Sequence, residues 1–259
     1  MNVRIAYIEE PPYYWTAEDG SVVGADIELA DAVLRAIGIT SIQHMRVSFD
    51  ELLPGVQEGR WDMNVPIFVT AERAKHVAFS MPVWALGDGF LVQPGNPKAL
   101  VSYKALAARA DARLGIIAGQ VQFDSAKSAG VGVGQIVVFR NQPEAVVALV
   151  AGEIDAFAGT AVGNRAAAAG HPKLEAVAHA LDKDARIPVG AFSFDRGNHS
   201  LLRAVNEQLH RYLGSADHRA RVAKYGITQT EIDSVLPAKS GVYGGRAGAP
   251  DGAQDETCF

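Results

Sequence analysis

Arg73 lies in a sequence setting that suits the binding of a carboxylate. Residues 65–69 show the alternating apolar pattern of a strand, and Thr70 then offers an N-cap for a short helix. The backbone N–H groups of residues 71–73 would therefore point at any group beside the arginine. A planar guanidinium next to free helix N–H groups binds a carboxylate through paired hydrogen bonds. The alternative at this point is an exposed arginine in a surface salt bridge.

The same segment is part of a longer signature. After the strand it reads T-x-E-R and then F-S-x-P, formed by Thr70, Glu72, Arg73, Phe79, Ser80 and Pro82. This run resembles the lobe-one signature of the solute-binding proteins of polar amino-acid ABC transporters (family 3). Further pieces in the same order extend the resemblance over most of residues 3–236: PPYYW (11–15), GADIELADAV (24–33), LLPGVQEGRWD (52–62), GEIDAFAGT (152–160) and VGAFSFDRGN (189–198).

The resemblance implies an α/β fold with two lobes, the type II periplasmic binding protein fold, in which mixed sheets are flanked by helices. The ligand cleft would lie between the lobes, and two hinge strands near residues 89–94 and 187–192 would let it close around a ligand. The expected lobes are residues 1–90 with 190–237, and residues 91–189. Residues 238–259, rich in Gly and Ala, are expected to form a disordered tail.

The pattern of apolar residues and turn signals also predicts these layers. Strands and helices alternate along the chain, which favours parallel sheets covered by helices. Two pairs, Ser48 with Glu51 and Asn141 with Glu144, predict capping boxes at helix starts. The predicted strands are 3–8, 61–68, 89–93, 113–119, 135–140, 155–159 and 187–194, and the clearest predicted helices are 26–37 and 200–213.

The loops that follow the strands hold residues expected to line the cleft. Glu10 and Tyr13 lie in a loop that two prolines stiffen, and the alternative role of the tyrosine is to cover the rim of the core. Phe49 occupies a position where family members often bring an aromatic ring to the pocket. Its alternative role is a hydrophobic staple beside the Ser48 cap.

Two departures from the family pattern bear on the ligand. Phe68 stands five residues before Arg73, where the family usually has Thr or Ser, and Thr160 stands where the family usually has the Asp that pairs with the α-ammonium. A primary ammonium without a carboxylate partner is costly to desolvate, so an ordinary α-amino acid is expected to bind poorly. Ring faces and the carboxylate of Glu10 instead suit a compact zwitterion with a delocalised or alkylated cation.

This arrangement resembles the ectoine- and hydroxyectoine-binding members of the family. There, an acid three residues before an aromatic ring and an aromatic ring five residues before the arginine surround a cyclic amidinium. The pairs Glu10 with Tyr13 and Phe68 with Arg73 have both spacings, whereas the usual G-T turn of lobe two reads GQVQ at residues 119–122. The expected ligand-binding residues are Glu10, Tyr13, Phe49, Phe68, Arg73, Gly119, Gln120, Val121 and Thr160.

Composition narrows the classes of function. The 259 residues are 48% hydrophobic, enough for one large domain or two small ones, and no uninterrupted apolar stretch reaches the ~18 residues of a membrane span. A net charge of −5 without basic runs argues against nucleic acid. The single cysteine, Cys258, excludes an intrachain disulfide and a thiolate metal site, and the seven histidines lack metal-ligand spacing, so no metal or cofactor is expected.

The resemblance implies a monomeric ligand-binding component of an ABC importer, which captures a small zwitterionic carboxylate and works with a membrane permease. Such proteins are exported, yet the first strand follows Met1 at once and no signal peptide precedes it. A leader missing from this sequence, a start codon farther upstream and a cytoplasmic location all stay open.

Two other roles of this fold also stay open. One is a cyclohexadienyl dehydratase-like enzyme with Glu9 or Glu10 as the acid, and the other is a ligand-sensing domain that acts with a partner protein. A binding protein is expected and not an enzyme, because the pattern places no second acid or base in lobe two.

Overall fold

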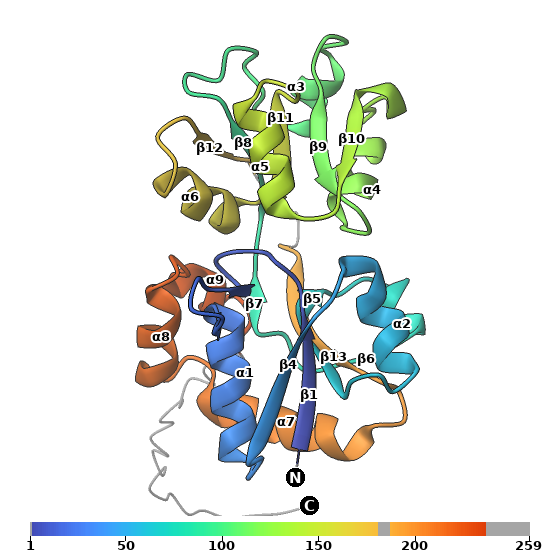
Figure 1. The fold of residues 1–259 in the computed structure, drawn as a ribbon, viewed down its shortest axis with the longest axis vertical. Helices are drawn as coiled ribbons and strands as arrows, with labels where there is room; N and C mark the ends of the chain where they lie inside the picture. Colours follow the sequence, from blue (N-terminus) through green and yellow to red (C-terminus); the bar gives the residue numbers. More distant parts are fainter. Residues whose placement is uncertain (1, 181–186, 237–259) are drawn as a thin grey trace, which may run out of the picture.

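The chain folds into two lobes, each built on a sheet of its own (Figure 1). The computed structural model describes residues 2–180 and 187–236, so the predicted tail at 238–259 lies outside the described residues. No helix within the described ranges is long and apolar enough to cross a membrane.

Lobe one holds the N-terminal part of the chain and the described part after residue 187. Its elements are β1 (Asn2–Tyr7), β2 (Trp15–Thr16), β3 (Val22–Val23), α1 (Ala25–Ala36), β4 (Ser41–Arg46), η1 (Phe49–Glu51), α2 (Leu52–Gln57), β5 (Met63–Phe68), η2 (Arg73–Lys75), β6 (Ala78–Phe79), β7 (Trp84–Ala85), β13 (Val189–Phe194), α7 (His199–Tyr212), α8 (Ala216–Ala223) and α9 (Gln229–Asp233). The main sheet has the order β4-β1-β5-β13-β6, and β7 also pairs with β13. Strand β1 is parallel to β4 and β5, whereas β13 is antiparallel to β5, so the sheet is mixed.

Lobe two holds the middle of the chain. Its elements are β8 (Asp88–Val92), α3 (Tyr103–Ala107), β9 (Leu114–Ile117), α4 (Gln122–Ser128), η3 (Val133–Gln135), β10 (Ile136–Phe139), α5 (Gln142–Val150), β11 (Ala156–Thr160), α6 (Ala161–Ala169) and β12 (Glu175–Ala178). The sheet has the order β10-β9-β11-β8-β12, in which β9 is parallel to β10 and β11 while β8 is antiparallel to both of its neighbours.

The cores follow from side-chain alternation along the strands. Phe90 and Leu91 are consecutive on β8 and fully buried, but they belong to two different apolar clusters because neighbouring strand residues point to opposite faces. In lobe one, the predicted apolar face of α1 packs into a single large cluster that includes Leu34 and Phe192. Each lobe therefore has a core of its own, as the composition allowed.

The two predicted capping boxes differ in outcome. The Ser48 and Glu51 box forms as predicted. Asn141 caps α5 by accepting from the backbone N–H of Glu144, but the Glu144 carboxylate accepts from the Asn141 side chain and from the N–H of Arg140 instead of closing the box.

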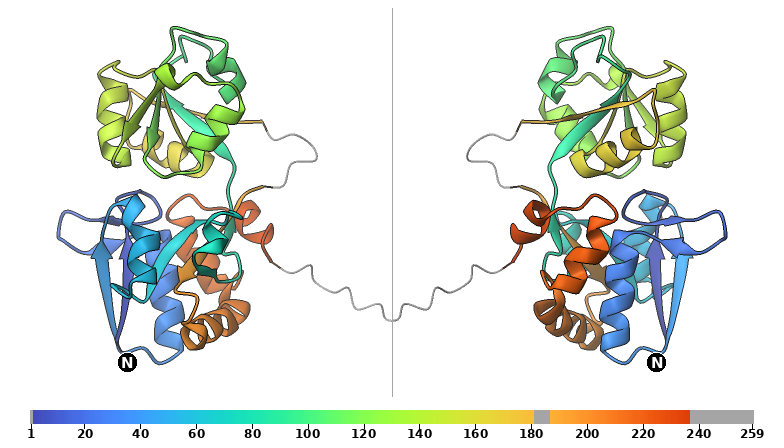
Figure 2. Two further views of the ribbon diagram at one scale, coloured as in Figure 1. Left: turned by 90° about the vertical axis from the view of Figure 1, so that its right-hand side faces the viewer. Right: turned by 90° about the vertical axis from the view of Figure 1, so that its left-hand side faces the viewer.

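The segment that follows β7 connects lobe one to lobe two (Figures 1 and 2). The chain enters the lobe-two sheet at Asp88, directly after residues 86–87, and returns between β12 and β13. The first predicted hinge lies too late in the chain, because residues 89–92 pair with both β11 and β12 inside lobe two, whereas the second, 187–192, begins just before β13 and remains a prediction. The lobe ranges predicted with boundaries at residues 90 and 190 remain a prediction.

Candidate ligand-binding site

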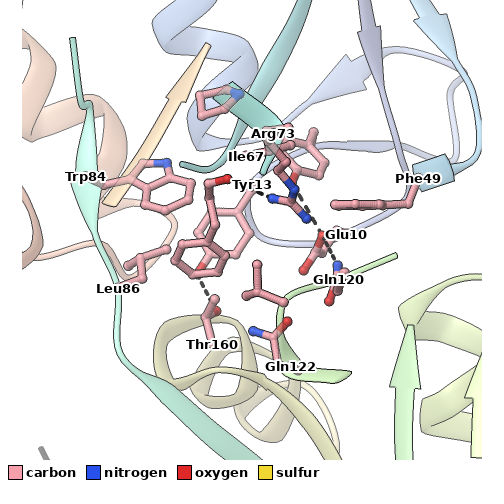
Figure 3. Close-up of a pocket in the computed structure, with 14 residues that line it drawn as sticks. Glu10, Tyr13, Phe49, Ile67, Arg73, Trp84, Leu86, Gln120, Gln122 and Thr160 are labelled. Atoms are coloured by element: carbon pink, nitrogen blue, oxygen red, sulfur yellow. Dashed lines mark hydrogen bonds between the residues drawn. The ribbon is translucent and has the colours of Figure 1, made fainter. Parts of the chain in front are cut away.

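A pocket lies where the two lobes meet and encloses about 360 Å³ of space between atoms (Figure 3). Eight of the nine predicted site residues line it, and the ninth, Gly119, contributes a backbone carbonyl beside it. The lining residues are Glu10, Tyr13, Tyr14, Phe49, Pro66, Ile67, Phe68, Arg73, Trp84, Leu86, Gln120, Val121, Gln122 and Thr160. Their roles toward a ligand remain a prediction.

Arg73 is buried in the wall of this pocket, with 8% of its surface exposed. Its Nη1 donates to the carbonyl of Phe68 at 2.8 Å, and its Nη2 donates to the carbonyl of Gly119 in lobe two at 3.0 Å. Its guanidinium carbon lies 5.1 Å from the centre of the Phe49 ring. The alternative interpretation of Arg73 as an exposed residue in a surface salt bridge was therefore wrong.

The helix start before Arg73 differs from the prediction. Thr70 does accept a hydrogen bond from the backbone N–H of Arg73, at 3.1 Å, but the helix is the three-residue 3₁₀ turn η2. That N–H is consequently occupied by the threonine hydroxyl. The carboxylate-binding capacity resides in the arginine side chain, because each terminal nitrogen of a guanidinium carries two N–H groups and only one on each is bonded within the described residues.

The loop that carries Glu10 and Tyr13 is held by the start of α1. The backbone N–H of Asp26 donates to the carbonyl of Tyr13 at 3.0 Å, and a bridge joins Glu10 to Tyr14. Gly24 allows this close approach, because it adopts a φ of 133° and a Cβ there would lie 2.2 Å from the Tyr13 carbonyl oxygen. The helix N-terminus thus fixes the positions of the acid and the two rings.

Contacts from both lobes close the pocket. The hydroxyl of Tyr13 lies 2.6 Å from that of Thr160, and Gln120 donates to Glu10 at 2.9 Å. Gly119, with a φ of 79°, comes so near the Phe49 ring that a Cβ would lie 2.9 Å from its Cδ1 atom. Together with the bond from Arg73 to lobe two, these contacts show the closed arrangement of the lobes.

Aromatic rings form the wall on the lobe-one side. Phe68 packs edge-on against Trp84 at 5.2 Å between ring centres, and Tyr13 lies 6.2 Å from Trp84. The indole N–H of Trp84 donates to both carboxyl oxygens of Asp26 at 3.2 Å, and these hydrogen bonds fix the orientation of the ring. Burial raises the pKa of Asp26 well above its ordinary value, and the nearby charge of Glu10 acts in the same direction. Asp26 does not line the pocket, so the carboxylate that can face a ligand is that of Glu10.

Glu10 is the titratable group whose ionisation would matter most to a cation in the pocket. Burial raises its pKa to about 7, against the lowering effects of the hydrogen bonds from Gln120 and Tyr14 and of the positive charge of Arg73. Burial likewise lowers the pKa of Arg73, although a guanidinium stays charged in proteins. A cationic ligand beside Glu10 would favour the carboxylate form.

Thr160 is engaged on both sides. Its hydroxyl accepts from the backbone N–H of Gly163 at 3.0 Å, which caps α6, and it also bonds with Tyr13. The position that the family pattern associates with an ammonium partner is thus occupied by a helix cap and a lobe-to-lobe hydrogen bond.

Several pocket residues were missed from the sequence, notably Trp84, Leu86 and Gln122. Trp84 and Leu86 lie just before the chain crosses to lobe two, so a correct hinge position would have pointed to them. Gln122 is two residues beyond Gln120 in the same turn. Tyr14, the next residue after Tyr13, is in the core and also lines the pocket.

The site shows no metal-binding arrangement. Across residues 2–180 and 187–236, no group of three or more His, Cys, Asp or Glu side chains could hold a metal ion.

The family of the chain follows from its sequence. Residues 3–227 match the bacterial extracellular solute-binding proteins, family 3. The chain belongs to this family. A relative in Sinorhizobium fredii, a probable amino-acid ABC transporter periplasmic-binding protein, is 29% identical over 245 residues that cover 92% of this chain and 81% of that protein.

Solved structures share the fold. EhuB in complex with hydroxyectoine has a TM-score of 0.79 at 26% identity, with 92% of this chain and 95% of EhuB covered. An ancestral arginine-binding protein bound to arginine has a TM-score of 0.75 at 26% identity, with 86% of this chain and 97% of that protein covered. The fold is therefore the two-lobed type II periplasmic binding protein fold, with mixed sheets flanked by helices.

Proposed function

We propose that this protein is the ligand-binding component of an ABC importer and that it captures a small zwitterion of the ectoine or hydroxyectoine type. The family and the relative in Sinorhizobium fredii support the role in import. The likeness to EhuB in complex with hydroxyectoine supports the ligand class. The observation that carries this ligand class is the state of Thr160, which replaces a carboxylate and whose hydroxyl is already bonded to Tyr13 and Gly163.

Arg73 supplies the carboxylate end of the site. The carbonyls of Phe68 and Gly119 hold its guanidinium from two lobes, and one N–H on each terminal nitrogen faces no acceptor within the described residues. Those two N–H groups suit a carboxylate bound in bidentate fashion. Because Gly119 belongs to lobe two, the hydrogen bond from Arg73 to its carbonyl forms only when the lobes are closed.

Glu10 and the aromatic wall supply the cation end. Tyr13, Phe49, Phe68 and Trp84 all line the pocket, and the faces of such rings attract a diffuse cation. A primary ammonium instead needs several acceptors placed around one nitrogen. Since Glu10 contributes the single carboxylate among the described lining residues, a delocalised cation fits better than an α-ammonium.

Capture by lobe closure follows from the contacts across the cleft. A ligand can enter only when the hydrogen bonds between Tyr13 and Thr160, and between Glu10 and Gln120, are broken. Rotation at residues 86–87, between β7 and β8, would open the pocket. The closed form, as a monomer outside the cytoplasmic membrane, would then meet the permease of the importer.

Binding without turnover agrees with the distribution of titratable groups. Glu10, Tyr13, Tyr14 and Arg73 all come from lobe one, whereas the described lining residues of lobe two carry no ionisable side chain. A dehydratase would need an acid and a base placed on the two sides of its substrate.

A thermal-shift screen of zwitterionic solutes tests the proposal. Ectoine or hydroxyectoine at 100 times its Kd should stabilise the protein by about 2.7 kcal/mol, and Arg73→Ala should abolish the shift. Stabilisation by glutamine or arginine alone would reassign the ligand to an α-amino acid. Turnover of prephenate or arogenate would establish the enzyme in its place.

A further inference from the structure

A partly buried chain of hydrogen bonds in lobe two ends at the pocket. The hydroxyl of Tyr103 donates to Oδ2 of Asp88 at 3.0 Å, and Nε2 of Gln122 donates to Oδ1 of the same carboxylate at 3.0 Å. Gln122 is 2% exposed and lines the pocket, whereas Asp88 lies behind it at the start of β8. The carboxylate thus connects the inner surface of lobe two to the ligand site.

The hydrogen bonds determine which end of the Gln122 amide faces Asp88. An ionised carboxylate only accepts hydrogen bonds, so the NH₂ group must point toward it and the carbonyl oxygen must point away. Burial raises the pKa of Asp88, and the hydrogen bonds from Tyr103 and Gln122 oppose that rise by favouring the charged form. The orientation of Gln122 is consequently set from behind the pocket.

The other end of this amide has no partner. Oε1 of Gln122 is buried and lacks a hydrogen bond within the described residues. Figure 3 shows the Gln122 side chain on the lobe-two side of the pocket, across from Arg73. Buried acceptors are nearly always paired in folded proteins, so this oxygen indicates a donor that arrives with the ligand.

We propose that Oε1 of Gln122, oriented by Asp88, accepts a hydrogen bond from an N–H group on the cation of the ligand. This inference rests on the proposed function and narrows it. An amidinium carries N–H groups on two nitrogens, so one can meet Glu10 of lobe one and the other can meet Gln122 of lobe two. A fully alkylated cation carries none and would leave the buried oxygen unpaired.

Gln122 is accordingly a specificity-determining residue and Asp88 is a positioning residue. Glu10 of lobe one and Gln122 of lobe two accept from opposite sides of the same cation, so both hydrogen bonds form only when the lobes are closed. The site therefore selects N–H-bearing cations over fully alkylated ones of similar size.

Calorimetry with a matched pair of ligands tests this inference. The pair is ectoine and the weaker-binding of its two mono-N-methylated derivatives, which lacks one amidinium N–H group but keeps the other, the carboxylate and the charge. Wild type should bind ectoine at least about tenfold more tightly, equivalent to about 1.4 kcal/mol. Gln122→Met, which keeps the shape of the side chain but removes the acceptor, should bring the two affinities to within about twofold of each other.

Asp88→Asn tests the positioning role. An asparagine amide can donate to Oε1 of Gln122, so the glutamine can turn its NH₂ group into the pocket, and the preference for ectoine should be lost as in Gln122→Met. Tyr103→Phe is the matched control, because it removes the other hydrogen bond to Asp88 and leaves the contact with Gln122. That variant should keep the preference. The ratio of the two affinities is the readout, since a general loss of stability would lower both.

The outcomes separate the two levels of the account. A wild-type protein that binds both compounds equally, or a Gln122→Met variant that keeps the preference, overturns the inference while the proposed function stands. An Asp88→Asn variant that keeps the preference overturns the positioning role. A wild-type protein that binds neither compound overturns the proposed function and this inference with it.

Discussion

Replacing Arg73 by alanine should remove the carboxylate-binding end of the site while the fold remains. The guanidinium is 8% exposed and already holds the carbonyls of Phe68 and Gly119, so a ligand carboxylate would be paired with it away from water. Removing one partner of a buried, hydrogen-bonded charge pair costs about 2–5 kcal/mol, which corresponds to a loss of affinity from about 30-fold to several thousandfold.

Arg73→Lys should fall between wild type and alanine. A lysine keeps the charge but not the planar fork, so it can neither hold both carbonyls nor bind the carboxylate in bidentate fashion. Lys75→Ala is the matched control, because Lys75 lies in the same 3₁₀ turn and its ion pair with Glu72 is exposed. Such surface pairs contribute little, so this variant should bind as wild type does.

Isothermal titration with ectoine on all four proteins measures these affinities. Thermal melts of each variant without ligand check that the fold persists. A folded Arg73→Ala variant that loses less than about tenfold in affinity would refute the reasoning, because a buried bidentate partner must contribute more than about 1.4 kcal/mol.

Three further changes test other parts of the site. Burial raises the pKa of Glu10 from its ordinary 4.5 to about 7. Affinity for a cationic ligand, titrated across pH, should therefore rise about tenfold per pH unit up to about pH 7 and then level off. The Glu10→Gln variant should show a flat profile. The stability of the unliganded protein should change in the opposite direction. Thermal melts should show wild type losing stability relative to Glu10→Gln as the pH rises from 4.5 through about 7. A stability difference that does not change with pH would contradict the raised pKa. Phe68→Thr should weaken binding of ectoine by about 2- to 30-fold while binding of α-amino acids holds or improves, as competition titrations would show, because one ring is lost from the wall beside Trp84. Tyr13→Phe keeps its ring but loses the bond to Thr160, so affinity should fall by about 2- to 10-fold, and small-angle scattering of the unliganded variant should show a larger radius of gyration than wild type; an unchanged radius would assign closure to other contacts.

The parts of the site that could be predicted are those encoded in short runs of sequence. Arg73 lies next to its helix start, and Glu10 and Tyr13 share one proline-rich loop. Their spacing in the sequence is therefore enough to identify them as candidate site residues. Phe68 and Thr160 were informative because each stands at a fixed place in a recognisable run. All of these lie at the ends of predicted strands, where side chains of neighbouring strands converge.

The parts that were missed depend on contacts between distant segments. Trp84 is oriented toward the pocket by the hydrogen bonds from its indole N–H to Asp26 on α1. Gln122 depends on Asp88 in the same way. The run at 89–93 was interpreted as a hinge although it forms a buried central strand, because an apolar run does not reveal which strands will flank it.

The most direct test of the account is a titration of the wild-type protein with ectoine, glutamine and arginine under identical conditions. The account predicts that ectoine binds most tightly, because Thr160 is occupied by Tyr13 and Gly163 and no carboxylate stands there to meet an α-ammonium. A tighter constant for glutamine or arginine would contradict it.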